Sequence, residues 1–264
     1  KTIGFVPTMG CLHQGHGALI SHSAEQNDIT VLSIFLNPTQ FSCREDYAKY
    51  PRCREEDLVL AKASGATVIF APNEDELYPA GFQTTVDVRE LAKPLCGEKR
   101  PGHFVGMATI VLKLLNIVRP DRAYFGQKDY QQVCIVKQMA LDLNLEAEII
   151  SYPTVREKSG LACSSRNTRL TKEETERASW IFRLLQQAAG MVAGSKSGFV
   201  AASDLHDLLT TELGKHDMEV EYVEIVDGAS LRPKSHADGG TLLAVAVFMG
   251  AVRLIDNILI PEKE

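Results

Sequence analysis

Short apolar runs alternate with segments of helical periodicity through the first half of the chain, and this alternation limits the possible folds more than any other feature. The expected strands cover residues 3–6, 29–36, 66–70, 123–125 and 147–151, and the expected helices begin near residue 13 and cover 55–64, 107–118 and 130–143. Strands that alternate with helices form βαβ units, which build a parallel sheet through right-handed crossovers. The sequence therefore predicts an α/β domain with a parallel sheet.

The pattern changes after residue 153. Thr171 and Glu174 have the spacing of a capping box, which marks the start of a helix. The elements expected here are a helix from 171 to 192, a loop at 194–198, a second helix that is capped by Ser203 or Asp204 and runs to 215, and strands at 220–226, 241–249 and 252–260 with a tight turn at 250–251. We therefore expect an α/β chain with a Rossmann-like parallel-sheet domain at 1–154 and a smaller α+β domain at 155–264.

Composition narrows the functions that such a chain can have. Of its 264 residues, 45% are hydrophobic and 23% are charged, and the formal net charge is −6. This acidic balance argues against broad nucleic-acid binding, which requires a basic surface, and no apolar run is long enough to span a bilayer. The six cysteines form no C-x-x-C pair, so we expect reduced thiols in a cytoplasmic protein rather than a zinc site or a disulfide framework. The chain begins at Lys1 rather than Met, so we expect native sequence to precede it.

Residues 7–16, Pro-Thr-Met-Gly-Cys-Leu-His-Gln-Gly-His, form the most informative motif. They join the first strand to the first helix through a turn at Gly10. At such a junction, unpaired backbone N–H groups and the positive end of the helix favour an anion such as phosphate. His13 and His16 lie three residues apart, so they share one face of the first helical turn and can donate hydrogen bonds to phosphate oxygens. The alternative is that these histidines are solvated or only cap the helix.

Two further polar motifs fall at carboxyl ends of expected strands, which is where ligands bind in open parallel sheets. Asn37 and Gln40 follow the second strand and offer amide groups to a hydroxyl or carboxylate ligand, unless they form an ordinary Asn-Pro turn. Gly-Gln-Lys-Asp at 126–129 follows the strand at 123–125. Here Lys128 can contact phosphate, and Asp129 can either cap the next helix or bind a ligand.

Other polar segments have both an ordinary and a functional interpretation. Gln131 and Gln132 lie on the first turn of a helix, and one of them is expected to face the cleft. Arg-Pro-Gly-His-Phe at 100–104 brings a cation and an imidazole to a turn, although Pro-Gly turns are common. Cys-Ser-Ser-Arg-Asn at 163–167 is either a mobile phosphate clamp between the domains or a solvated loop. The acidic run that ends at Asp57 favours a solvated helix start, with Mg²⁺ binding as the other interpretation.

Taken together, five motifs occur in one order: Pro-Thr-Met-Gly-x-Leu-His-x-Gly-His, Asn-Pro-x-Gln-Phe, Arg-Pro-Gly-His-Phe, Gly-x-Lys-Asp-Tyr-Gln-Gln and Ser-Ser-Arg-Asn. The first resembles the His-Ile-Gly-His signature of the nucleotidyltransferase superfamily. With all five, essentially the whole chain closely resembles the pantothenate synthetase (pantoate–β-alanine ligase) family. The resemblance implies ATP-dependent condensation of (R)-pantoate with β-alanine through pantoyl adenylate, with release of pyrophosphate and AMP. It also implies Mg²⁺ with ATP, a homodimer, and a C-terminal domain that acts as a lid.

The resemblance assigns roles to three groups of residues. The catalytic residues are His16, as the proton donor, His13 and Lys128. The residues that bind pantoate and β-alanine are Gln40, Gln132 and Asn37. The ATP-binding residues are Met9, Gly10, Cys11, Leu12, His13, Gln14, Gly15, His16, Gly126, Gln127, Lys128, Asp129, Val155, Cys163, Ser164, Ser165 and Arg166, with Val155 contacting adenine through its backbone.

The chain departs from the family at Cys11, Gln127 and Cys163, where a small polar residue, glutamate, and methionine or leucine are common. If Cys11 lies beside the ATP loop, we expect its alkylation to slow the enzyme and ATP to protect it. Two other functions are considered. A cytidylyltransferase-like enzyme would leave the Asn-Pro-Thr-Gln-Phe motif and the second domain unexplained. A non-catalytic nucleotide-binding module would not need the histidine pair with Lys128 and Arg166.

Overall fold

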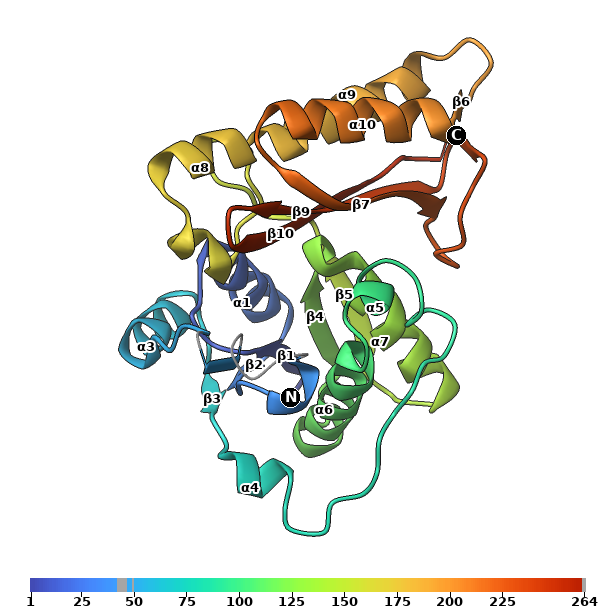
Figure 1. Ribbon diagram of the computed structural model, residues 1–264. Helices are drawn as coiled ribbons and strands as arrows, with labels where there is room; N and C mark the ends of the chain where they lie inside the picture. Colours follow the sequence, from blue (N-terminus) through green and yellow to red (C-terminus); the bar gives the residue numbers. More distant parts are fainter. Residues whose placement is uncertain (42–46, 49, 263–264) are drawn as a thin grey trace. The chain divides into compact units, whose positions relative to one another are not determined.

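The computed structural model describes residues 1–41, 47–48 and 50–262, which divide into two compact units, Lys1–Val155 and Arg156–Glu264 (Figure 1). The boundary predicted from the sequence lies one residue earlier, after residue 154. The α/β class is confirmed, because the first unit contains a parallel sheet and the second contains antiparallel sheets. Cys43 lies outside the described residues. Within the described part of the chain, no helix is long and apolar enough to cross a membrane.

A five-stranded parallel sheet in the order β3-β2-β1-β4-β5 forms the centre of the first unit (Figure 1). Its strands are β1 (Ile3–Thr8), β2 (Ile29–Ile34), β3 (Val68–Phe70), β4 (Arg122–Gly126) and β5 (Glu148–Tyr152). The chain moves outward from β1 to β3 and then returns to start β4 on the other side of β1. β1 and β4 therefore flank the point where the strand order reverses, and in open sheets a ligand crevice forms at the carboxyl ends beside such a point.

Helices and short 3₁₀ helices connect the strands of this sheet. They are α1 (Gln14–Gln26), α3 (Arg54–Ala63), α4 (Glu74–Leu77), α5 (Cys96–Lys99), α6 (His103–Val118) and α7 (Tyr130–Asp142), with short 3₁₀ helices η1 (Pro38–Gln40) and η2 (Gln127–Asp129). A buried cluster joins α1 and α3 to the sheet; its members are Val6, Leu19, Ile20, Leu32, Ala61 and Tyr124. α6 ends at Val118; its C-cap residue Arg119 has a left-handed φ of 49° and stands just before Pro120, which cannot extend a helix.

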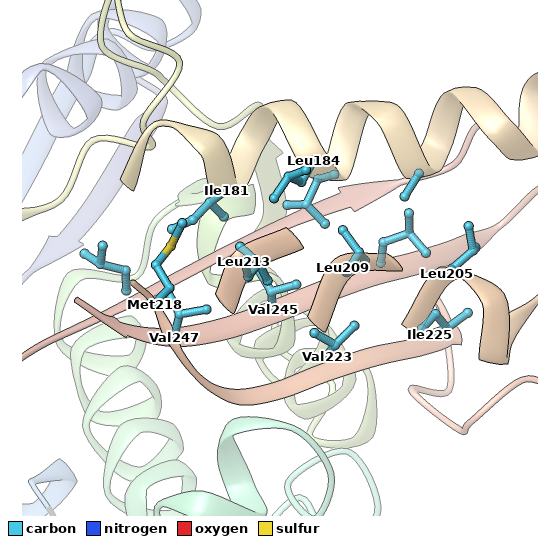
Figure 2. Close-up of a cluster of buried hydrophobic side chains, with 14 of the residues drawn as sticks. Ile181, Leu184, Leu205, Leu209, Leu213, Met218, Val223, Ile225, Val245 and Val247 are labelled. Carbon is cyan, nitrogen blue, oxygen red and sulfur yellow. The ribbon is translucent and has the colours of Figure 1, made fainter. Parts of the chain in front are cut away.

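The second unit is an α+β domain with its own core. Its strands are β6 (Val200–Ala201), β7 (Glu219–Asp227), β8 (His236–Ala237), β9 (Thr241–Met249) and β10 (Val252–Leu259), and its helices are η3 (Ser165–Arg169), α8 (Lys172–Ala178), α9 (Trp180–Gly194) and α10 (Ala202–Lys215). Figure 2 shows Ile181 and Leu184 of α9 and Leu209 of α10 in one buried cluster with side chains of the antiparallel sheet.

Two sequence predictions in this unit need correction. The helix expected from 171 to 192 has the predicted capping box but is two helices, α8 and α9, separated at Ser179. The Ser179 hydroxyl donates to the carbonyl of Glu176 at 2.7 Å, so it competes locally for a helical acceptor. The next helix begins directly after β6 at Ala202, with Ala201 at the N-cap position, so the predicted Ser203 or Asp204 cap is wrong.

Candidate active site

The buried carboxylate of Asp57 binds the backbone of the loop after β1. Asp57 of α3 is only 2% exposed, and its two oxygens accept the backbone N–H groups of Cys11 at 2.9 Å and Leu12 at 2.6 Å. Gly10 has φ of 84°, and a Cβ on it would lie 3.1 Å from an Asp57 oxygen. Cys11 is also left-handed, with φ of 49°. Asp57 is therefore not part of a solvated helix start, because it anchors a strained turn at the carboxyl end of β1.

His13 and His16 cap the first turn of α1 reciprocally. His13 is the N-cap residue, and its Nδ1 accepts the N–H of Gly15 at 3.1 Å. His16 Nδ1 accepts the N–H of His13 at 3.3 Å, and the two ring centroids are 4.0 Å apart. Because each Nδ1 accepts a hydrogen bond, the proton of each neutral ring must be on Nε2. Both rings therefore present an Nε2–H donor on the side away from the backbone they cap.

The environment keeps both imidazoles uncharged near neutral pH. Burial, together with the Lys128 ammonium, lowers the pKa of His13 to about 4, while Asp129 acts in the opposite direction. The pKa of His16 lies well below its ordinary value, chiefly because the ring is buried and further because of His13 and Lys128. The two rings can therefore offer an anion neutral N–H donors, and Lys128 adds a positive charge that acts on both.

The use of the backbone differs from the sequence prediction. The N–H groups of this turn were expected to be unpaired, but those of Gly10, Cys11, Leu12, His13 and Gly15 bind Thr8, Asp57, His16 and His13 side chains. These N–H groups are therefore already satisfied inside the protein. The imidazole Nε2–H groups replace them as donors to a ligand, so the histidines both cap the helix and extend its donor capacity outward.

Lys128 lies in η2 at the carboxyl end of β4, the neighbour of β1. Its side chain is 18% exposed, and its Nζ lies 3.7 Å from an Asp129 carboxylate oxygen. Asp129 stands at the N-cap position of α7, but its side chain makes no capping hydrogen bond, so the capping role considered for it is wrong. The positive charge of Lys128 lowers the pKa of both histidines, so it acts electrostatically on the same pair of rings.

A buried amide pair follows β2. The Asn37 side chain donates to Gln40 Oε1 at 3.0 Å and to the Gly106 carbonyl at 3.1 Å, and its Oδ1 accepts the Tyr78 hydroxyl at 2.8 Å. Gln40 Nε2 donates to the sulfur of Met9 at 2.9 Å, which brings it to the loop after β1. Asn37 is thus saturated with partners, whereas among the described residues the donor of Gln40 has only a weak acceptor in thioether sulfur.

Two side chains of the segment at 100–104 contact the backbone carbonyl of Gln40. His103 Nδ1 lies 2.7 Å from the Gln40 carbonyl oxygen, and Arg100 lies 3.4 Å from the same oxygen and 3.3 Å from His103 Nε2. Since a carbonyl only accepts, His103 must carry its proton on Nδ1. Gly106 allows this approach, because a Cβ there would lie 2.3 Å from the Thr39 carbonyl oxygen.

The two glutamines at the start of α7 differ in burial, and the expectation that one of them faces the cleft stays a prediction. Gln131 is buried, accepts the N–H of Cys96 at 3.1 Å and donates to the carbonyls of Leu91 and Pro94. Gln132 is half-buried. Gln131 therefore organises the segment before α5, which leaves Gln132 as the candidate for substrate contact.

The remaining expected ATP residues lie at the end of the first unit and in the second. Val155 is the last residue of the first unit. In the second unit, Ser164 caps η3 by accepting the N–H of Arg166 at 3.2 Å, and Ser165 and Cys163 are buried. Asn167 donates to Glu157 at 2.7 Å. The Ser-Ser-Arg-Asn segment is therefore an ordered turn rather than the solvated loop considered as its alternative.

The described residues hold no group of three or more His, Cys, Asp or Glu side chains that could bind a metal ion. Both oxygens of Asp57 are engaged with backbone N–H groups. Mg²⁺ binding by Asp57 stays a prediction, and its observed contacts support a structural role.

Cys11 is less reactive than the sequence suggested. It is 7% exposed, and burial, with Cys53 and nearby carboxylates, raises the pKa of its thiol to about 12. A buried thiol with a raised pKa alkylates slowly. The structure therefore does not support Cys11 as an alkylation handle on the loop.

This arrangement coincides with a known family. The model of the family described as "Pantoate-beta-alanine ligase" matches residues 1–259. The chain belongs to the pantoate–β-alanine ligase family. As a member of this family it is an enzyme that joins pantoate to β-alanine, which decides against the cytidylyltransferase-like and non-catalytic alternatives.

Individual relatives agree with the pantoate–β-alanine ligase assignment. The pantothenate synthetase of Caldicellulosiruptor saccharolyticus is 49% identical over 98% of this chain and 92% of its own length, and pantothenate synthetase 1 of Bradyrhizobium diazoefficiens is 51% identical over 98% and 91%. The crystal structure of the Thermus thermophilus pantothenate synthetase has a TM-score of 0.93 at 40% identity, covering 99% of this chain and 94% of that one. That of the Francisella tularensis ligase, complexed with "Beta-gamma ATP and Beta-alanine", has a TM-score of 0.81 at 38% identity, covering 98% and 89%.

Sequence reasoning missed several residues that shape the site. It gave Tyr78, Thr39 and Gly106 no role, and it left Arg100 and His103 undecided between a turn and a site. Tyr78 follows a short helix with no motif around it, so no local signal identifies it. The Arg-Pro-Gly-His-Phe segment did carry a signal, because it brings two nitrogen-rich side chains to one turn.

Proposed function

We propose that this ligase activates (R)-pantoate at the carboxyl ends of β1 and β4, using the phosphates of ATP held by His13, His16 and Lys128. The observation that supports the proposal is the histidine pair: both Nδ1 atoms accept backbone N–H groups, which leaves Nε2–H as the remaining donor of each ring, and the Lys128 charge lowers the pKa of both. A carboxylate is a poor acyl donor, so a pantoate oxygen first attacks the α-phosphorus, which gives pantoyl adenylate and releases pyrophosphate. The amine of β-alanine then attacks the carbonyl carbon and AMP leaves.

The side chains contribute position and charge stabilisation rather than a covalent nucleophile. As pantoate attacks, negative charge develops on the α-phosphate oxygens, where two N–H donors and an ammonium stabilise it. Bound phosphate also raises the pKa of a nearby imidazole. His16 therefore acts first as a hydrogen-bond donor, and it gains the character of a proton donor only once ATP is bound.

Pantoate fits beside the loop through Gln40 and Gln132. Gln40 Nε2 donates to the Met9 sulfur, and a carboxylate or hydroxyl oxygen of pantoate is a stronger acceptor that would replace this sulfur. Asn37 holds the other end of the Gln40 amide, so we assign it a positioning role. After pantoyl adenylate has formed, the same amide can receive the carboxylate of β-alanine.

The other expected participants complete the proposal. Met9–His16 and Gly126–Asp129 form the ATP site in the first unit, Val155 contacts adenine, and Cys163–Arg166 closes on the phosphates as part of a C-terminal lid. Mg²⁺ enters with ATP as the metal–nucleotide substrate, because small divalent cations are held largely by phosphates and water in such sites. We also propose a cytoplasmic homodimer, as the resemblance to the family implies.

Two assays test this function: pantoate-dependent exchange of labelled pyrophosphate into ATP, and β-alanine-dependent release of AMP. Replacing His16 with asparagine keeps an acceptor where Nδ1 lies but removes the Nε2–H, so exchange should fall about 10³-fold with the fold intact. Replacing it with glutamine keeps a donor near Nε2 but loses the cap, so exchange should fall less while α1 is destabilised. His22→Ala, on the same helix, is the control.

Exchange that does not depend on pantoate would reject the adenylation step. Exchange near the wild-type rate in His16→Asn would refute the role of Nε2–H. Circular dichroism at the assay temperature separates both results from unfolding.

A further inference from the structure

Two cysteines connect the loop after β1 to the beginning of α3, and the proposed chemistry uses neither sulfur. The Cys53 Sγ lies 3.0 Å from the Cys11 Sγ, although the residues are 42 positions apart in sequence. Cys11 is buried within the loop, and Cys53 is half-buried at the N-cap position of α3. We propose that Cys11 and Cys53 are a modification site that forms a reversible disulfide with a low-molecular-weight disulfide as oxidant.

The backbone around both thiols is already fixed in a suitable arrangement. Asp57 donates its N–H to the Cys53 carbonyl at 2.8 Å, and its carboxylate accepts the N–H groups of Cys11 and Leu12. One helical turn thus ties both cysteines to the same residue. The sulfur atoms need to approach by only about 1 Å to reach the bond length of a disulfide, about 2.05 Å. The bond can therefore form with the loop close to its present position.

The difference in exposure sets the order of the chemical steps. Cys53 is the more exposed, whereas Cys11 is buried and its thiol has a raised pKa, so Cys53 meets the oxidant first. The Cys53 thiolate attacks one sulfur of oxidised glutathione, so that a new S–S bond forms and one glutathione thiolate leaves. The Cys11 sulfur then attacks the Cys53 sulfur, and the second glutathione leaves as a thiol with the Cys11 proton. Two protein thiols are oxidised, and one glutathione disulfide is reduced to two thiols.

The disulfide would protect the loop rather than inactivate it. A glutathione group left on Cys53 would place a bulky, charged adduct against the loop that holds the ATP residues, and attack by Cys11 expels that adduct. Because Asp57 holds the loop in place, the closed disulfide should leave adenylation within twofold of the reduced enzyme. This statement about activity rests on the proposed function, whereas formation of the bond does not.

The test incubates the full chain with oxidised glutathione and maps its peptides without reduction. We expect a crosslink between the peptides that contain Cys11 and Cys53, reversed by dithiothreitol, and a rise in melting temperature of about 5 °C. Cys11→Ala should retain a stable glutathione adduct on Cys53. Cys53→Ser should show neither crosslink nor thermal shift, and when reduced it should have wild-type exchange activity.

Several results would overturn the proposal. They are a persistent glutathione adduct on Cys53 in the unsubstituted chain, a crosslink from Cys53 to another cysteine, and a Cys11–Cys53 crosslink with more than tenfold loss of exchange. Peptide mapping and melting temperature do not depend on catalysis. Failure of the ligase assays in the reduced enzyme would therefore be distinguishable from failure of the disulfide.

Discussion

Replacing Asp57 with asparagine tests whether the loop after β1 depends on one buried carboxylate. The carboxylate accepts two N–H groups, from Cys11 and Leu12, whereas asparagine has one acceptor and turns a donor toward the other N–H. Removing the acceptor of a hydrogen bond to a charged group, which leaves the buried N–H unsatisfied, costs about 1.5–3 kcal/mol in total. The conformation of the loop after β1 should therefore be destabilised by about 2–3 kcal/mol.

We expect this loss to affect stability and ATP use together. At about 1.4 kcal/mol per factor of ten, kcat/KM for ATP in pyrophosphate exchange should fall about 30- to 100-fold. The melting temperature should fall by several degrees, since 1 kcal/mol corresponds to about 2–4 °C in a domain of this size. The half-saturating Mg²⁺ concentration should not change, because the role is to hold the backbone rather than to bind metal.

Glu56→Gln is the matched control, because it removes the same charge from an exposed neighbour on the same helix. It should leave kcat/KM within twofold. The reasoning is refuted if Asp57→Asn uses ATP normally, or if its chief effect is a raised Mg²⁺ requirement, which would return Asp57 to the metal-binding role.

Three further predictions concern stability. The unfolding free energy should fall as pH decreases from 6.5 toward about 4, because unfolded His13 takes up a proton that the folded ring, with its pKa near 4, does not. Urea titrations at several pH values should show that the unfolding free energy of His13→Asn depends less steeply on pH in this range. Gly106→Ala should lower the melting temperature markedly, because its Cβ would lie 2.3 Å from the Thr39 carbonyl oxygen, and an unchanged calorimetric transition would contradict this. Asp256→Asn should destabilise the second unit by about 3 kcal/mol, because it removes the buried carboxylate that half-buried Arg156 contacts in a bidentate pair at 2.6 and 3.0 Å. Fluorescence of the single tryptophan, which lies in that unit, would report the change during urea unfolding.

The parallel sheet could be predicted from the sequence because its cause is local. Each buried strand of a parallel sheet is a short apolar run, and each helix carries its own periodicity, so the order of elements is visible without knowledge of contacts. The failures occurred where neighbouring signals competed. Ser179 has a hydroxyl that bonds to a helical carbonyl, and it divides a segment whose apolar periodicity continues on both sides.

In the candidate site, too, residues within local motifs could be predicted, whereas their partners from distant parts of the sequence could not. His13, His16 and Lys128 were identifiable because the motifs that contain them lie within a few residues of strand ends. The partners that complete their surroundings are distant in sequence: Asp57 is 46 residues from Cys11, and Tyr78 is 41 from Asn37. Neither has a motif of its own, so the fact that Asp57 occupies the loop N–H groups could not be predicted from local pattern.

The reciprocal cap of His13 and His16 makes the catalytic donors an outcome of helix formation. If either ring turned over, α1 would lose a cap and the ligand would face a lone pair instead of an N–H. The folded first turn therefore fixes the tautomer and the orientation of both rings before substrate binds, so the two imidazoles need no rearrangement when it does. Fraying of the first turn of α1 would therefore abolish activity while the sheet stayed folded. On heating, activity should be lost at a lower temperature than tertiary structure.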